Sequence, residues 1–486
     1  MPRLVSIERK PWLRTAIYTF MTLTVTVIVS LLMLVVLGYQ FNQKDGRLEQ
    51  GGLLQFYSIP TGAQVTLNEI GLGSLTNTKT IVDAGNHFVV YNKQDYRAWQ
   101  KSITVTPGQV AWLTYARLIP QTITPEPLQT YSTLSGALAS SDRRYMLLQQ
   151  AAELPKFTLV DIQGDTPKYS TLTLPTASYT APATGKKQSF VLDSWSGDSQ
   201  AVLIRHTYDA NKTEWILLDR EKPERSINLS TTYVIAPSRV EFAGGNHSLL
   251  FVQVGDIVQR INLDEQTLSR PLATRISTFT IFDEKTITYV TKADAKLQRT
   301  VGYATVSIPE PQTIETYPAD KKPLFASLSQ YFNQTYVGIV HGNDLTVLKG
   351  ELPTPDRVGS LKKFASHTVP RGVTNLEVRG SGRFVVVMLQ SGYVTYDIEL
   401  QKYDETTWKY TSKTPRPSLQ WLDNYMLWSD YGGTLRFYEF DGANQQDIIP
   451  AAEGFAASLS PNDKYIYDIA KTEDGYVLQR GLLILQ

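Results

Sequence analysis

The first strong pattern along the chain is one long apolar run near its start. Residues Ala16 to Gly38 carry no charged side chain over 23 positions. A helix of that length spans about 34 Å at about 1.5 Å per residue, which is enough to cross a hydrocarbon core about 30 Å thick. No other stretch of the sequence is comparable. The pattern predicts one transmembrane helix over residues 15–38, with Trp12 and Arg14 where it enters the membrane.

Charged residues on either side of this run predict its orientation. The 14 residues before it contain four basic side chains and one acidic one: Arg3, Arg9, Lys10 and Arg14 against Glu8. Because basic flanks stay in the cytoplasm, we expect a cytoplasmic tail over residues 1–14 and an extracytoplasmic position for everything after the helix. A cleaved signal peptide is the alternative. Its apolar region would be about 7–15 residues long, shorter than this run, so an uncleaved anchor is favoured.

A period of two residues replaces the apolar run after a polar linker expected over residues 39–50. Between residues 51 and 120, runs such as LLQFYSI, HFVVY and SITVT alternate apolar and polar residues or are rich in β-branched and aromatic ones. Turn signals separate these runs, among them Pro60-Thr61-Gly62 and Pro107-Gly108. The pattern predicts a small antiparallel β-sandwich of about 70 residues, which is large enough to fold by itself.

The same segment resembles a PEGA domain. The resemblance rests on Ser58-Ile59-Pro60-Thr61-Gly62-Ala63, on Gly85-x-His87-Phe88-Val89-Val90, on Tyr96-x-x-Trp99 and on Val105-x-Pro107-Gly108. Thr61 stands where the Pro-Glu-Gly-Ala pattern has Glu, but Pro60 and Gly62 set the geometry of the turn. The resemblance implies an extracytoplasmic surface module without catalytic activity, and it suggests a bacterial source. We expect Tyr96 and Trp99 to belong to the core, with an aromatic sugar-binding platform as the alternative.

The remaining residues, 121–486, repeat a unit made of a short strand, a polar turn and a very apolar strand. The first and last copies begin at Ala137 and Ala457, which are 320 residues and seven intervals apart, so the mean period is about 46 residues. The eight copies begin at Ala137, Asp193, Val240, Phe279, Ala326, Leu376, Leu419 and Ala457. A period of about 40–50 residues with four strands per unit is typical of a β-propeller.

The two ends of the repeat array predict how the propeller closes. The last unit lacks a fourth strand, and residues near Thr122–Tyr131 are unassigned just before the first unit. Pairing these ends would remove the open edges of a linear array. We therefore expect eight blades, with seven as the alternative if the copy around Phe279 is divided between its neighbours. Turns such as Ser460-Pro461-Asn462-Asp463 resemble those of Tol-system-type propellers, but no WD series assigns a subfamily.

Composition and charge narrow the function further. The chain contains no cysteine, which excludes disulfides, thiol catalysis and cysteine-ligated metal centres. Its formal net charge is +1, and removing the tail with four basic residues and one acidic residue leaves 43 basic and 45 acidic residues, or −2. A surface so close to neutral argues against nucleic acid as a partner. No motif in the sequence implies a cofactor.

No catalytic motif is present, and the candidate binding residues lie in loops of the repeat array. The sequence has no G-x-S-x-G elbow, no Walker A loop and no H-E-x-x-H pair. His206 and His341 each end the second strand of a unit, near Asp209 and Asp344, and would lie on the same face of the ring. Units two and five are three apart, so ordinary exposed loop residues are the simpler interpretation, and no metal site is predicted.

These observations predict a binding or scaffold protein of the cell envelope, held to the bilayer by one helix. The propeller would present rigid loop faces to a protein or glycan partner. Two alternatives stay open. A carbohydrate-active enzyme would need acidic or histidine residues clustered at the mouth of the central channel. A purely structural envelope component would show self-association and no discrete pocket.

Overall fold

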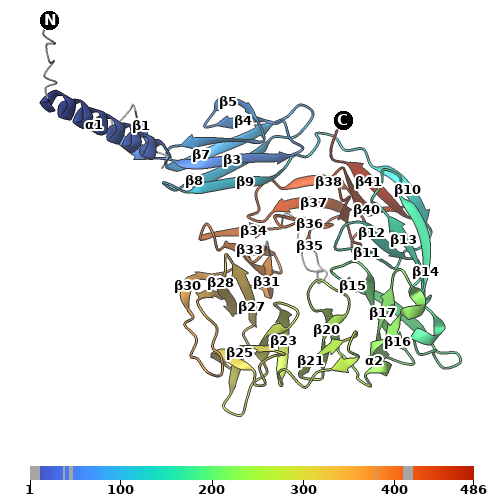
Figure 1. The fold of residues 1–486 in the computed structure, drawn as a ribbon. Helices are drawn as coiled ribbons and strands as arrows, with labels where there is room; N and C mark the ends of the chain where they lie inside the picture. Colours follow the sequence, from blue (N-terminus) through green and yellow to red (C-terminus); the bar gives the residue numbers. More distant parts are fainter. Residues whose placement is uncertain (1–10, 37–38, 43–46, 380, 409–419, 486) are drawn as a thin grey trace, which may run out of the picture. The chain divides into compact units, whose positions relative to one another are not determined.

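The structure, a computed structural model, describes residues 11–36, 39–42, 47–379, 381–408 and 420–485. Its elements fall into two compact units, Met1–Gln121 and Thr122–Gln486. The first begins with helix α1 (Pro11–Val36), drawn in dark blue in Figure 1. Trp12, Arg14 and Ala16 are exposed on it. The expected tail over residues 1–10 and Gly38, the expected end of the membrane segment, lie outside the described residues.

The segment expected to be a polar linker contains two strands instead. β1 (Tyr39–Asn42) pairs with β2 (Arg47–Gln50) as an antiparallel hairpin, with Tyr39 opposite Gln50. The linker prediction was wrong because each strand has only four residues, which is too short for a two-residue period to be recognised.

A two-sheet sandwich follows this hairpin. One sheet has the order β6-β3-β9 and the other the order β5-β4-β7-β8. Their strands are β3 (Gly52–Ile59), β4 (Gln64–Leu67), β5 (Ile70–Leu75), β6 (Thr78–Val82), β7 (Gly85–Asn92), β8 (Trp99–Val105) and β9 (Val110–Arg117). The sandwich is not wholly antiparallel as expected, because β3 and β9 pair in parallel. β5 also occupies a stretch that had been assigned to a turn.

The core of the sandwich contains the two aromatic residues that the sequence singled out. Tyr96 is 5% exposed and Trp99 is 2% exposed. The Trp99 ring stacks on Tyr91 with centroids 4.6 Å apart, and Tyr91 meets Phe56 edge-on. Their burial confirms the core interpretation and leaves neither ring available as a sugar platform.

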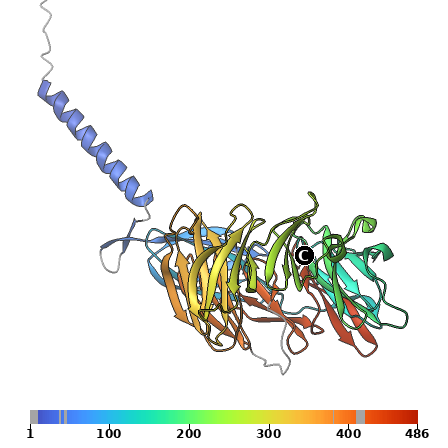
Figure 2. The ribbon, with the colours of Figure 1, turned by 90° about the horizontal axis from the view of Figure 1, so that it is seen from below.

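The described residues of the second unit form eight four-stranded sheets, so eight blades are confirmed and the seven-bladed alternative was wrong. Figure 1 shows these blades following one another around a ring from teal to red, and Figure 2 shows them side by side from another direction. The first four blades are β11 (Gly136–Ala139), β12 (Tyr145–Gln149), β13 (Lys156–Asp161) and β14 (Lys168–Thr173); β15 (Gln188–Trp195), β16 (Ala201–Tyr208), β17 (Lys212–Asp219) and β18 (Ile227–Asn228); β19 (Arg239–Phe242), β20 (Leu249–Val254), β21 (Ile257–Asn262) and β22 (Thr267–Leu268); and β23 (Ile276–Ile281), β24 (Thr286–Thr291), β25 (Gln298–Thr305) and β26 (Gln312–Pro318).

The other four blades complete the ring. They are β27 (Leu324–Tyr331), β28 (Gln334–His341), β29 (Asp344–Lys349) and β30 (Lys362–Thr368); β31 (Val373–Arg379), β32 (Phe384–Leu389), β33 (Gly392–Asp397) and β34 (Lys402–Thr407); β35 (Gln420–Trp421), β36 (Met426–Ser429), β37 (Thr434–Glu439) and β38 (Gln446–Pro450); and β39 (Ser458–Leu459), β40 (Tyr465–Thr472) and β41 (Gly475–Leu482) with β10 (Glu126–Tyr131). Short helices lie in two of the connections, at Thr176–Ser178 and Leu229–Thr232, and a third at Pro223–Arg225 precedes β18.

Closure of the ring joins the two ends of this unit as predicted. β10, from residues before the first repeat, pairs with β41 near the C-terminus, with Tyr131 opposite Tyr476. An Arg480–Glu126 ion pair with 2.7 Å between Nε and Oε2 lies across the same seam. The pairing supplies the strand that the last repeat lacks, so the last blade has four strands like the others.

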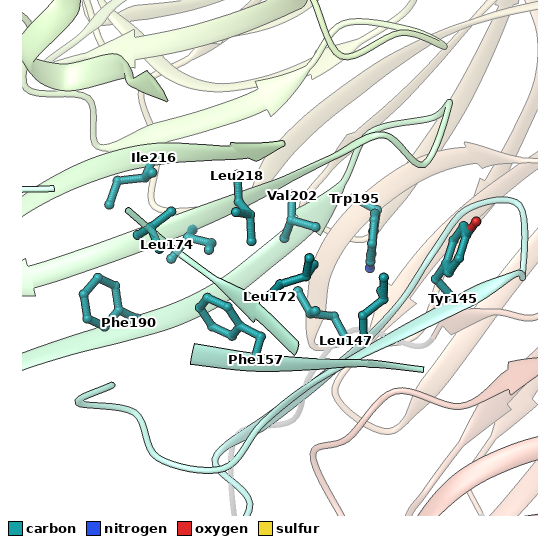
Figure 3. Close-up of a cluster of buried hydrophobic side chains, with 12 residues drawn as sticks. Tyr145, Leu147, Phe157, Leu172, Leu174, Phe190, Trp195, Val202, Ile216 and Leu218 are labelled. Atoms are coloured by element: carbon teal, nitrogen blue, oxygen red, sulfur yellow. The ribbon is translucent and has the colours of Figure 1, made fainter. Parts of the chain in front are cut away.

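Apolar layers between neighbouring blades hold the ring together. Figure 3 shows the layer between the β11–β14 and β15–β18 sheets, where Phe157, Phe190 and Val202 are buried, with Trp195 and then Tyr145 toward one end. Comparable clusters lie at other blade contacts, for example around Phe251 and around Val385. These layers arise because the second and third strands are apolar on both faces, which a sheet needs when it is covered on both sides.

Candidate functional site

A large cavity in the propeller lies along the innermost strands of four successive blades. It has a volume of about 910 Å³ and is lined by residues of β19, β23, β27 and β31, each the first strand of its sheet. Its volume falls within the range of about 300–1,000 Å³ that ligand sites occupy in proteins. The cavity is therefore the first candidate for a binding site in this unit.

Alternation along the inner strands explains why much of the cavity wall is polar. On β23, Phe279 and Ile281 belong to an apolar layer between blades and also border the cavity, while Thr278 and Thr280 add hydroxyl groups to its wall. β31 repeats this arrangement: Leu376 belongs to a layer and borders the cavity, and its neighbours Asn375 and Glu377 add polar groups to the wall. Successive side chains of a strand point to opposite sides, so one sequence stretch serves both roles.

Two charged pairs lie on opposite ends of this four-strand wall. On β19, Arg239 Nε donates to Glu241 Oε1 over 2.6 Å, and the guanidinium lies 4.3 Å from the centre of the Phe279 ring. On β31, Arg379 donates to Glu377 Oε2 with distances of 3.0 Å from Nε and 2.8 Å from Nη2. Each pair joins residues two apart on one strand, so the charges compensate locally.

A third carboxyl group influences the first pair. Partial desolvation inside the ring raises the pKa of Glu241, Arg239 acts to lower it, and the negative charge of Asp193 on β15 raises it again. The pKa of Asp193 is itself raised, mainly by desolvation, although Ser194, Arg205 and Arg239 oppose the shift. Two acidic groups on neighbouring inner strands thus share one electrostatic environment, which is a recognised feature of functional sites.

Neutral polar groups occupy the middle of the wall. Thr278, Gln330 and Asn375 line the cavity. Among the described residues their side chains form no hydrogen bond with the protein. The Thr280 hydroxyl, in contrast, donates to the carbonyl oxygen of Ala326 over 3.1 Å. These groups can therefore donate to and accept from a molecule inside the ring.

His206, a predicted loop candidate, is a buried structural residue. It is 0% exposed, and its ring stacks on Phe190 with centroids 4.3 Å apart. His206 Nδ1 lies 2.8 Å from Glu214 Oε1, and Glu214 also accepts from the Thr180 backbone and hydroxyl and from Asn228. Burial acts to raise the pKa of Glu214, but these hydrogen bonds lower it to about 2. The interpretation of His206 as an exposed loop residue was wrong.

Of the other three loop candidates, His341 and Asp209 have local partners. His341 Nε2 lies 3.0 Å from Asp320 Oδ2, at the end of the second strand of its blade as predicted. Asp209 accepts from the backbone of Ala183, and Asp344 is an exposed residue at the start of β29. Over the described residues, no three histidine, aspartate or glutamate side chains assemble into a group able to hold a metal. The structure thus keeps His206 and His341 in different environments.

The sequence contained a signal for the cavity that was not used. The first strands of four successive repeats alternate apolar with charged, hydroxyl or amide residues, as in Thr278-Phe279-Thr280 and Asn375-Leu376-Glu377. Such alternation on a strand that is buried on both faces is unexpected unless one set of side chains faces an internal space. Serine and threonine are also common on surfaces, which is why the pattern was overlooked.

Comparison with known proteins gives a family match for the first unit and distant structural matches for the chain. The PEGA domain family matches residues 52–118. No curated protein matches the chain. Among solved structures, Hsv2 of Kluyveromyces lactis is 9% identical with a TM-score of 0.38, covering 73% of this chain and 99% of its own.

Two further solved structures are similarly distant. The β-propeller domain of Swd1 (Cps50) from Myceliophteria thermophila is 11% identical with a TM-score of 0.37, covering 74% of this chain and 99% of its own. The oligogalacturonate lyase of Vibrio parahaemolyticus is 10% identical with a TM-score of 0.37. The match covers 63% of this chain and 96% of the lyase chain. Residues 52–118 therefore form a PEGA domain, and the described residues of the second unit fold as an eight-bladed β-propeller.

Proposed function

We propose that this chain is a single-pass membrane-anchored binding protein of the cell envelope, with its propeller outside the cytoplasm. The observation that carries the binding role is the closed ring with a polar cavity, in whose described wall Thr278, Gln330 and Asn375 form no side-chain hydrogen bond with the protein. A rigid ring positions such groups without an ordering cost when a partner binds. The partner is a protein or a glycan, and no cofactor is required.

Helix α1 supports the anchor. The segment Arg14–Val36 has 23 residues. Its most apolar stretch has a mean hydropathy of 2.4, and none of that stretch is buried against the rest of the protein. Thr19, Thr22, Thr24 and Thr26 donate their hydroxyl groups to carbonyl oxygens four residues earlier. These bonds satisfy the polar groups inside the helix itself, which a lipid environment requires.

The flanking charges support the orientation. A basic excess before the helix favours retention of that end in the cytoplasm, and a PEGA domain directly after it suits an extracytoplasmic position. The anchor would then limit the height at which the propeller is presented.

A second candidate function rests on two acidic groups, Glu241 in the cavity wall and Asp193 on the neighbouring inner strand. Asp193 and Glu241 lie on neighbouring inner strands, and desolvation raises the pKa of each. Glycosidases use two such carboxyl groups, one of them with a raised pKa. The ion pair between Glu241 and Arg239 weighs against this function, because it stabilises the ionised form that a general acid must avoid.

Protease protection and cross-linking in intact cells test the proposal together. Protease added outside should digest the propeller of the full chain while an N-terminal tag stays protected. Cross-linking should recover an envelope protein or wall polymer with the full chain, and a chain ending at Gln121, the end of the first compact unit, should lose it. Protection of the propeller, or partners that persist without it, would contradict the proposal. Recovery of further copies of the chain alone would indicate a structural component.

A further inference from the structure

The geometry points to an uncharged saccharide as the ligand of the cavity formed by β19, β23, β27 and β31. This inference rests on the proposed binding function and goes beyond it by naming the chemical class of the ligand. Three properties of the wall carry it: compensated charges, free neutral hydrogen-bonding groups and half-buried aromatic rings.

Charge compensation argues against highly charged ligands. Arg239 is paired with Glu241 at one end of the wall, and Arg379 with Glu377 at the other. Asp283 adds one carboxylate at the edge, where it accepts from the Lys285 backbone over 2.8 Å. With the cations already paired, the wall offers no basic surface for a polyanion and no strong field for a polycation.

Neutral groups on the same wall match the donors and acceptors of sugar hydroxyls. Thr278 on β23, Gln330 on β27 and Asn375 on β31 come from three different blades. A hydroxyl or amide group both donates and accepts, as a sugar hydroxyl does. After pairing, the carboxylates and guanidinium groups still have unused acceptors and donors. These can bind adjacent hydroxyl groups of one sugar ring.

Aromatic surface completes the match. Phe242, Phe282 and Phe325 line the cavity and are only half-buried. Aromatic faces pack against the apolar C–H faces of sugar rings, so a wall with both phenyl rings and neutral polar groups suits an amphipathic ring molecule. A cavity of about 910 Å³ has room for a short oligosaccharide rather than a single small ion.

Titration of the full chain with defined oligosaccharides tests the inference. The protein is kept in a detergent without a sugar headgroup and titrated calorimetrically with the N-acetylglucosamine tetramer, maltotetraose and mannotetraose. Tetragalacturonate and tetralysine serve as anionic and cationic probes, and a Gly-Ser tetrapeptide as a neutral peptide. We expect saturable binding of at least one neutral saccharide and none of the other three probes.

Matched variants locate the binding. The Thr278→Val and Asn375→Leu double variant removes two neutral groups of the wall and should weaken saccharide binding about tenfold or more, at about one hydrogen bond each. Thr346→Val is the control, because Thr346 lies on β29, the third strand of its blade, and does not line the cavity. The melting temperature of each variant is measured beside its binding.

The possible outcomes are distinct. The inference is overturned if none of the three neutral saccharides shows saturable binding. It is also overturned if the double variant binds as tightly as the wild type, or if the wild type prefers a charged probe or the peptide. If cross-linking in cells still recovers a propeller-dependent partner, the proposed binding function survives that failure.

Discussion

The apolar layers between blades and the wall of the central cavity are built from the same strands but have opposite properties. On β23, Phe279 borders the cavity but is only 1% exposed and belongs to a layer, while its neighbours Thr278 and Thr280 supply polar groups to the cavity wall. On β31, Leu376 is completely buried between charged and amide residues that face the ring interior. On these strands, alternate residues serve stability and ligand binding. Substitutions at the two kinds of position should therefore change stability and binding separately.

A deletion in a layer should have the largest effect on stability. Phe251 is completely buried between the β19–β22 and β23–β26 blades, so Phe251→Ala should cost about 3–5 kcal/mol through lost burial and a cavity. The measurement is the loss of near-ultraviolet circular dichroism on heating. Phe332→Ala is the control, because Phe332 is 78% exposed at the tip of a hairpin. Equal losses for both variants would contradict the role given to the layers.

Replacing a buried carboxyl group in the last blade should raise the stability of the protein by a large amount. Asp468 is 2% exposed, and burial raises its pKa to about 7 while Gln479 acts to lower it. Because the folded state holds this proton more tightly than the unfolded chain, stability falls as pH rises from about 4 to 7. Asp468→Asn should therefore stabilise the protein at pH 8 by up to about 4 kcal/mol, since one pKa unit is about 1.4 kcal/mol.

The pH dependence of that gain is the decisive readout. Melting temperatures of the wild type and Asp468→Asn should differ at pH 8 and approach each other at pH 4. Asp474→Asn, at an exposed turn of the same blade, should behave as the wild type at both values. A gain of the same size at both pH values would show that ionisation of Asp468 is not its cause.

A smaller loss of stability is expected when the polar network around Glu214 is weakened. Glu214→Gln weakens the hydrogen bonds to His206 and Thr180 and should cost about 1–3 kcal/mol at pH 7. Since the pKa of Glu214 is lowered to about 2, its stabilising effect is present above about pH 4.5 and is lost as pH falls toward 2. Glu221→Gln, on an exposed side chain, is the control. A deficit that persists at pH 2 would contradict this origin.

The smallest change in stability should come from the cavity wall. Glu377→Gln leaves Arg379 without its partner and should cost no more than about 1 kcal/mol, because the pair is partly exposed. It should nevertheless change selectivity, since an unpaired cation in the cavity attracts anions. Tetragalacturonate should bind the variant and not the wild type, most strongly at low salt. A large drop in melting temperature without altered selectivity would assign Glu377 to stability.

Much of the fold could be predicted because it follows from strand periodicity. The repeat of about 46 residues gave eight units, and the missing strand of the last unit predicted the pairing of β10 with β41. The parallel pairing of β3 with β9 could not be predicted, since alternation reports which face is buried and not the direction of the neighbouring strand. β5 was overlooked because its glycines resemble a turn.

The candidate site could be predicted only in part. The position of His206 near the end of a second strand was correct, but its burial depends on Glu214, eight residues later on the neighbouring strand. The cavity residues belong to four repeats that are distant in sequence, and only the closed ring brings their strands around one space. Neutral side chains such as Thr278 also show no charge pattern that would single them out.

Site-specific photo-cross-linking in intact cells tests the central claim most directly, namely that partners bind inside the ring. A photoreactive phenylalanine analogue replaces either Gln330, which lines the cavity, or Thr346, which lies on the third strand of the same blade. We predict that illumination yields an adduct with an envelope partner from position 330 and none from position 346. Adducts from position 346 alone, or from neither position while chemical cross-linking still recovers a propeller-dependent partner, would contradict the account.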